Sequence, residues 1–114
     1  MDYTIVNMED LPRSEGSRDF EGYLYGGAGV SIILVDMAPG EGPKLHKHPY
    51  EEVFIVQEGK ATYTIGSTTL EAIAGQIAIV PAGVPHKFIN SGSGRLRQVD
   101  LHHSARFITE WLEE

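Results

Sequence analysis

Residues 40–59 constrain this chain more than any other segment, because they place two histidines and a glutamate close together between glycines. His46 and His48 are two residues apart, and at that spacing in a β-strand both side chains point to the same face. Glu52 follows with the same parity, whereas Glu51 would point to the other face. Two imidazoles and a carboxylate suit Fe, Mn, Co, Ni or Zn. The segment therefore predicts β-structure that directs these side chains at one metal ion.

A second segment, residues 75–90, contains a candidate for a fourth ligand. It begins with an apolar run typical of a strand, turns through Pro81, Gly83 and Pro85, and continues from His86 as another strand. Proline restricts φ and glycine allows backbone angles that other residues avoid, so the turn has a defined shape. We therefore predict that His86 completes the metal site.

The two segments read G-x5-H-x-H-x3-E-x6-G and G-x5-P-x-G-x2-H-x3-N, and they resemble the two signature motifs of the cupin family at every specified position. The fifteen residues between Gly59 and Gly75 are similar to the short spacing of small bacterial single-domain cupins. The resemblance implies one all-β cupin domain over residues 1–114, with its motifs at 40–59 and 75–90. It also implies a double-stranded β-helix, a jelly-roll-like barrel of two antiparallel sheets with the metal in one mouth.

The rest of the chain has short apolar or alternating runs separated by turns, which is typical of a β-sandwich or barrel. A polar loop is expected over residues 13–19. Residues 107–114 carry apolar side chains at helical spacing and predict a short C-terminal helix or a docked tail. The expected strands cover residues 3–8, 20–25, 30–38, 53–57, 60–65, 68–73, 76–80, 86–90 and 95–102.

Five further residues are candidates for the wall of a substrate pocket, and each has an ordinary structural alternative. Tyr50 lies beside the ligands in sequence but fits a position on the rim equally well. Phe54 and Phe88 share the parity of the predicted ligands, and packing in the core is the simpler role for both. Gln98 and His102 alternate with apolar residues, so they face either the cavity or solvent.

The charge balance limits the partners. The 114 residues carry a formal net charge of −7, which argues against nucleic acid or a membrane surface, because phosphate contacts need clustered lysine and arginine. There is no cysteine, so thiolate chemistry is excluded. The first ten residues have neither a basic region nor a long apolar run, and we expect a cytoplasmic protein. We also expect a homodimer in which the first strand extends a neighbour's sheet.

Three histidines and a glutamate leave coordination positions open for water, dioxygen or a substrate oxygen. The sequence therefore favours a metal-dependent enzyme that acts on a small oxygen-rich molecule. The resemblance suggests a dioxygenase, an oxalate-type decarboxylase, or an isomerase or cyclase. The alternative is a sensing module that binds a metal and a small ligand without turnover, and a storage role ranks last. The choice among divalent Fe, Mn, Ni and Zn stays open, because this ligand set suits all of them.

Overall fold

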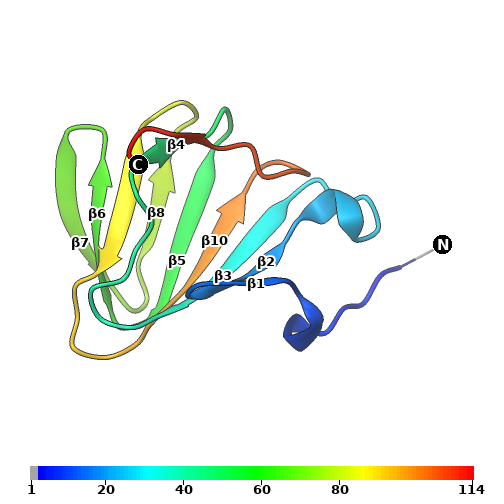
Figure 1. Cartoon of the computed structure of the whole chain (residues 1–114), viewed down its shortest axis with the longest axis horizontal. Helices are drawn as coiled ribbons and strands as arrows, with labels where there is room; N and C mark the ends of the chain where they lie inside the picture. Colours follow the sequence, from blue (N-terminus) through cyan, green and yellow to red (C-terminus); the bar gives the residue numbers. More distant parts are fainter. Residues whose placement is uncertain (1–2) are drawn as a thin grey trace.

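The computed structural model describes residues 3–114 and consists largely of β-strands arranged as two antiparallel sheets (Figure 1). The larger sheet has six strands in the order β1 (Arg13–Ser14), β2 (Ser17–Phe20), β3 (Ser31–Met37), β10 (Leu96–His102), β5 (Glu52–Glu58) and β8 (Ile77–Val80). The smaller sheet has five strands in the order β11 (Glu110–Trp111), β4 (His46–Lys47), β9 (His86–Asn90), β6 (Lys60–Ile65) and β7 (Thr68–Ile73). The prediction of two packed antiparallel sheets is confirmed.

Alternation of side chains along the strands builds the interior. In β5 every second residue from Glu52 to Val56 is buried, and in β10 every second residue from Leu96 to His102 is buried. One half of the interior is an apolar core, formed by Val35, Phe54, Val56, Ala61, Tyr63, Ala72, Val80, Phe88 and Leu96. The buried polar residues of the same strands lie toward one end of the barrel, so strand parity separates the core from the site.

Strand register brings the histidine-rich segments together. In the larger sheet His102 of β10 lies opposite Glu52 of β5. In the smaller sheet His46 of β4 lies opposite His86 of β9. The loop that leads into β4 packs tightly on β9, because a Cβ added at Gly42 would lie 1.9 Å from the Phe88 carbonyl oxygen. Only glycine allows this close approach between the loop and the strand.

The amino-terminal predictions were wrong in three places. Residues 3–7 form no strand, and the 3₁₀ turn η1 (Met8–Asp10) follows them. The expected loop over 13–19 instead contains the β1–β2 hairpin, and the expected strand over 20–25 gives way to the 3₁₀ turn η2 (Gly22–Leu24). The hairpin was missed because β2 pairs with β3, a partner that local polarity does not reveal.

Of the two alternatives for residues 107–114, the helix was wrong and the docked tail is what the structure shows. Glu110 and Trp111 form β11, which pairs with β4, and the Leu112 amide donates to the Leu45 carbonyl at 2.9 Å. The side chain of Trp111 is 60% exposed, so the apolar residues here have no core face on which a helix could pack. Figure 1 shows this segment in red, running from the end of β10 across one end of the barrel.

Within residues 3–114, no helix has the length and apolar character needed to span a bilayer.

Candidate metal centre

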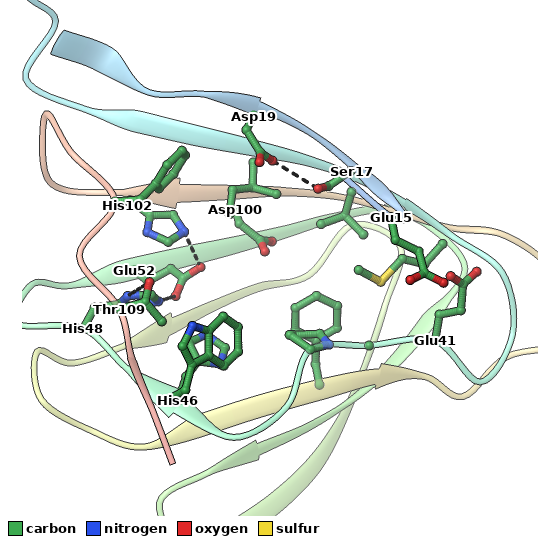
Figure 2. Close-up of a pocket in the computed structure, with 18 of the residues that line it drawn as sticks. Glu15, Ser17, Asp19, Glu41, His46, His48, Glu52, Asp100, His102 and Thr109 are labelled. Carbon is green, nitrogen blue, oxygen red and sulfur yellow. Dashed lines mark hydrogen bonds and ion pairs between the residues drawn. The ribbon is translucent and has the colours of Figure 1, made fainter. Parts of the chain in front are cut away.

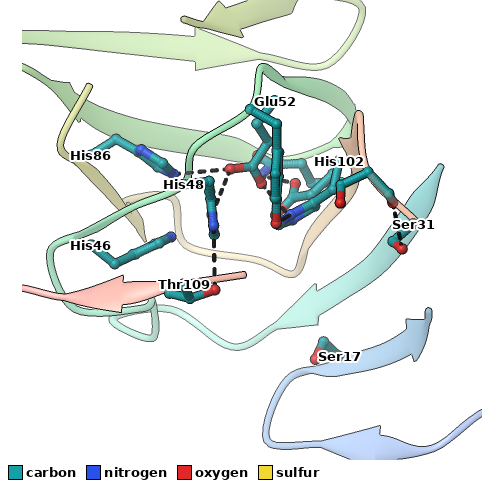
Figure 3. Close-up of polar contacts among 12 residues, drawn as sticks. Ser17, Ser31, His46, His48, Glu52, His86, His102 and Thr109 are labelled. Atoms are coloured by element: carbon teal, nitrogen blue, oxygen red, sulfur yellow. Dashed lines mark hydrogen bonds and ion pairs between the residues drawn. The ribbon is translucent and has the colours of Figure 1, made fainter. Parts of the chain in front are cut away.

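Four buried side chains converge at the end of the barrel, where the two sheets meet. His46 comes from β4, His48 from the loop after it, Glu52 from the start of β5 and His86 from the start of β9. One ligand atom from each lies within 4.8 Å of the others, and none of the four residues is more than 7% exposed. Figure 3 shows the imidazoles of these residues directed toward the Glu52 carboxylate. The structure thus brings together all four predicted ligands.

Backbone carbonyls orient three of the imidazoles. The Nδ1–H of His46 donates to the Lys44 carbonyl (2.6 Å), that of His48 to the Ile108 carbonyl (2.8 Å) and that of His86 to the Val84 carbonyl (2.9 Å). A carbonyl oxygen only accepts, so Nδ1 must carry the proton in each ring. The Nε2 atoms then face the centre and are the nitrogens available to a metal.

Glu52 provides the negative charge of the centre. Its Oε1 lies 2.9 Å from His86 Nε2 and 3.2 Å from His48 Nε2, while its Oε2 lies 2.9 Å from His102 Nε2. Burial raises the pKa of the Glu52 carboxyl, but the contacts with His102, His48 and His86 outweigh burial and hold the pKa well below its ordinary range. Glu52 is therefore an anion.

The pKa values of two imidazoles are shifted in opposite directions. Burial lowers the pKa of His46 to about 4, so its Nε2 has a free lone pair at neutral pH. Burial also lowers the pKa of His86, but the hydrogen bond to Glu52 and the Val84 carbonyl outweigh it, and the pKa is raised. Without a metal, the His86 Nε2 proton lies between the ring and Oε1 of Glu52. A metal ion bound by both groups would take the place of this proton.

Two buried nitrogen atoms without hydrogen-bond partners bear on whether the site fits a metal. The Nε2 atoms of His48 and His102 are buried and have no hydrogen-bond partner among the described residues. Both lie close to Glu52, at 3.2 and 2.9 Å, but their orientation does not meet hydrogen-bond geometry. A cation in the centre would satisfy His48. The donor set and this unpaired nitrogen therefore fit a divalent transition metal.

His102 extends the centre beyond the four predicted ligands. Its Nδ1 atom lies 2.7 Å from the oxygen of the Tyr50 hydroxyl. The same oxygen accepts a hydrogen bond from the Ile108 amide at 3.3 Å. Burial raises the pKa of Tyr50 to about 12, so the phenol stays protonated at neutral pH. With its Nε2 atom 2.9 Å from Oε2 of Glu52, His102 lies between this phenol and the metal centre.

A cavity of about 480 Å³ opens from the centre (Figure 2). Of the five predicted pocket residues, Phe88 and His102 line it. Tyr50 does not line the cavity and contacts His102 through its hydroxyl. Phe54 packs in the core, with its ring 4.9 Å from that of Tyr63. Gln98 also does not line the cavity, because its amide is held between the Tyr63 hydroxyl and a neighbouring carboxyl group.

That carboxyl group belongs to Asp100, which sequence reasoning did not select. Asp100 lines the cavity and is 3% exposed. Burial and then the charge of Glu52 raise the pKa of Asp100 well above its ordinary value, although the hydrogen bond from Gln98 opposes them. The alternation of residues along β10 could have identified Asp100, since it lies between Gln98 and His102 on the inward face of this strand.

Other cavity residues come from segments whose structure was mispredicted. Glu15, Ser17 and Asp19 belong to the β1–β2 hairpin, and Thr109 and Trp111 belong to the C-terminal segment. The Trp111 ring lies 4.9 Å from the His46 ring. No local pattern in the sequence places either segment beside the metal centre.

Comparison with known proteins gives one family match and several relatives. The family model described as "Cupin domain" matches residues 33–102. An uncharacterized protein of Streptomyces coelicolor is 36% identical over 59 residues, which are 52% of this chain and 56% of that protein. The HTH-type transcriptional regulator PuuR of Escherichia coli is 34% identical over 80 residues, which are 68% of this chain and 43% of PuuR. The chain thus spans about half the length of these curated relatives.

Among solved structures, oxalate decarboxylase of Lactobacillus farciminis superposes with a TM-score of 0.80. The identity is 22%, and the match covers 92% of this chain and 34% of the decarboxylase. This likeness establishes the shared fold.

Proposed function

The chain belongs to the cupin family, and on that premise we propose that it is a metal-dependent enzyme acting on a small, oxygen-bearing molecule. The observation that carries the proposal is the group formed by His46, His48, Glu52 and His86, four buried donors at the end of an open cavity. A metal site with a purely structural role is closed and needs no cavity beside its ligands. Here a small molecule can reach the centre.

A divalent metal held by these residues would polarise a substrate oxygen, and a redox-active one would also support oxidation. The chain's own contribution is positioning. The backbone carbonyls orient the imidazoles, His102 Nε2 lies beside the Glu52 carboxylate, and the side chains of Phe88 and Trp111 form part of the cavity wall. We propose a dioxygenase, a decarboxylase, or an isomerase or cyclase as the reaction class. Another structural neighbour, oxalate decarboxylase of Bacillus subtilis, has Mn(II) centres, and this supports Mn as one candidate metal.

A second candidate is a sensing module that binds a metal and a small ligand without turnover. The similarity to the transcriptional regulator PuuR favours it, because that match extends over 68% of this chain. The two candidates differ in the fate of the ligand. A ligand recovered unchanged after saturating the metal-loaded protein supports sensing, whereas chemical conversion supports the enzyme.

We further propose that the protein is a homodimer. Residues 3–8 do not form the strand that was expected to extend a neighbour's sheet. The proposed dimer therefore uses another surface. The outer face of the larger sheet is rich in aliphatic side chains, and Ile77 and Ile79 on it are 64% and 60% exposed. Burial of such a face in a partner would remove apolar surface from water.

The test of the proposed function is elemental analysis of protein purified without an immobilised-metal resin. We expect about one equivalent of Fe, Mn, Ni or Zn, lost in His48→Ala because the centre loses one nitrogen donor. His103→Ala removes an exposed histidine and serves as the matched control.

Turnover is then assayed on metal-loaded protein with diketones, flavonoids, oxalate and keto-sugars. Absence of metal in the native protein, even after reconstitution, would contradict the metal site. Metal without turnover of any substrate would favour the sensing module.

A further inference from the structure

A second cavity, of about 700 Å³, lies at the end of the larger sheet that is remote from the metal centre. It is lined by residues of η1, the β1–β2 hairpin, β3 and the start of β10, and Figure 1 shows these four strands side by side. Arg97 and His102 lie near opposite ends of β10, about 17 Å apart at the rise of an extended strand. The function proposed above therefore assigns no role to this second cavity.

Arginine is concentrated around the second cavity. Four of the five arginines in the sequence line it, and no lysine of residues 3–114 does so; the four are Arg13, Arg18, Arg95 and Arg97. The whole chain has a formal net charge of −7, so this cluster has the opposite sign to the rest of the molecule. Guanidinium groups present a planar fork of N–H donors that matches carboxylate and phosphate oxygens, which an ammonium group does not.

We propose that the second cavity binds a small dianion, a molecule with two carboxylate or two phosphate groups, through the guanidinium groups of Arg13, Arg18 and Arg97. This inference goes beyond the proposed function, because the dianion would bind away from the metal centre. It also stands apart from that function, because no metal is needed to hold the ligand.

The pairing of β1 with β2 carries the inference. Strand register places Arg13 directly opposite Arg18, and like charges in opposed positions destabilise a pair of strands. Among residues 3–114, neither arginine forms an ion pair with a carboxylate. An anion held between the two guanidinium groups would replace their repulsion by attraction to a shared partner.

The acidic residues of the cavity do not neutralise these arginines. Three carboxyl groups line it, those of Glu9, Asp36 and Glu41. Asp36 is engaged by Arg95, whose Nε donates to Asp36 Oδ1 and whose Nη2 donates to the Asp36 carbonyl, both at 2.8 Å. Glu41 accepts a hydrogen bond from the Ala38 amide at 2.7 Å. Glu9 contacts Arg18 through its backbone carbonyl, which accepts from Nη1 at 2.9 Å and orients the guanidinium group.

Arg97 brings a third free guanidinium group to the cavity from β10. It lies opposite Asp36 on β3 and Glu58 on β5, but it forms no ion pair with either within the described part of the chain. Register places the Cα atoms of Arg18 and Arg97 two strands and two residues apart, about 12 Å. Two anionic groups on one short molecule could therefore each meet a guanidinium group.

The surface between these arginines is apolar. Arg18 lies opposite Leu34, and Leu34 lies opposite Val99, so the three side chains form one row on the outer face of the sheet. Leu34 and Val99 line the cavity and offer contact to a short hydrocarbon chain between the two anionic groups. The exposed isoleucines on which the dimer proposal rests belong to β8, at the far edge of the same sheet.

The experiment titrates the zinc-loaded, ¹⁵N-labelled full chain with three four-carbon probes: butanedioate, butane-1,4-diyl bisphosphate and butane-1,4-diol. We expect at least one dianion to bind more than about tenfold more tightly than the neutral diol. The amide signals of Arg18 and Arg97 should shift, whereas that of His102 reports on the metal centre. The dianion that binds more tightly identifies the anionic group, and either order supports the inference.

Substitutions then test whether the cavity is the site. Arg13→Gln and Arg97→Gln should each weaken binding of the preferred dianion about tenfold, because each removes a charge-assisted contact. Arg106→Gln is the matched control and should leave the affinity unchanged. Arg106 is the fifth arginine and lies outside the cavity, with its guanidinium carbon 3.8 Å from the centre of the Tyr23 ring. All three arginines are exposed, so the variants should keep the native amide spectrum.

Failure of both dianions to bind at millimolar concentrations would overturn the inference, as would equal binding of the diol. Shifts confined to the metal centre, or an unchanged affinity in both Arg13→Gln and Arg97→Gln, would also overturn it. An equal loss of affinity in Arg106→Gln would show general charge attraction in place of a site. The titration is repeated on the metal-free protein, where binding should persist, so the result is independent of the metal analysis that tests the proposed function.

Discussion

Two buried acids in the same cavity have pKa values that are shifted in opposite directions, and their neighbours explain the difference. Glu52 has the Nε2 atoms of three histidines within 3.2 Å, and these contacts lower its pKa despite burial. Asp100 has only the Gln98 amide, so desolvation and the Glu52 charge raise its pKa. Cationic or donor groups around a buried carboxyl favour its ionised form, and burial without them favours its protonated form.

Replacing Asp100 by asparagine should stabilise the metal-free protein at neutral pH. The raised pKa means that folded Asp100 binds its proton more tightly than the unfolded chain does. Its contribution to stability is therefore full below the unfolded pKa, about 4, and is lost as pH rises through the folded pKa. In the Asp100→Asn variant, the carbonyl oxygen of the new side chain would still accept the hydrogen bond from Gln98.

The measurement is urea unfolding of both proteins from pH 4 to pH 8, with the free energy of unfolding taken at each pH. We expect the advantage of Asp100→Asn to grow as pH rises. A constant difference would show that Asp100 has the same pKa in the folded and unfolded states.

The C-terminal segment acts as part of the metal centre although it holds no predicted ligand. The Ile108 carbonyl accepts the Nδ1–H of His48, and the Ile108 amide donates to the Tyr50 hydroxyl. Beyond them, β11 pairs with β4 and covers the edge of the strand that carries His46. Backbone groups of this one segment therefore orient His48 directly and His102 through Tyr50.

Deletion of residues 108–114 should weaken metal binding without abolishing it. The imidazole of His48 would lose the carbonyl that fixes its Nδ1 proton, and losses of such supporting contacts typically lower metal affinity about 10–100-fold. Competition with a chelator of known affinity measures the change. Ile108→Ala keeps the carbonyl and should bind metal normally. Unchanged affinity in the deletion would show that the segment does not position the ligands.

Across the whole molecule, the outer face of the larger sheet carries two aliphatic rows that cross four strands. Register places Ile77, Ile55, Val99 and Leu34 in one row and Ile79, Val53, Leu101 and Ile32 in the other. The outer face of a sheet exposed to water normally alternates with polar residues. These rows are therefore the surface on which we propose that two copies associate.

A charge in the middle of this face should separate the proposed dimer. Light scattering of the native protein is expected to give twice the chain mass of 12.5 kDa. Ile79→Lys combined with Ile55→Lys should give the monomer mass, because lysine ammonium groups cannot be buried without partners. Ile73→Lys, on β7 of the other sheet, is the control and should remain dimeric. A native mass of 12.5 kDa would contradict the proposal.

Local spacing in the sequence was enough to select His46, His48, Glu52 and His86 as candidate ligands and to predict a sandwich or barrel, and the resemblance to the cupin motifs added the two antiparallel sheets. Ligands two or four residues apart in one short segment, or just after a Pro/Gly turn, depend on backbone geometry over a few residues. The tertiary structure was needed for the hairpin over residues 13–20, for β11 and for the role of Asp100. Each of these depends on a distant partner: β2 pairs with β3, β11 pairs with β4, and Asp100 shares its cavity with Asp19, 81 positions earlier in the chain. Pairing between distant strands overrides local propensity, and no pattern within a few residues predicts that pairing.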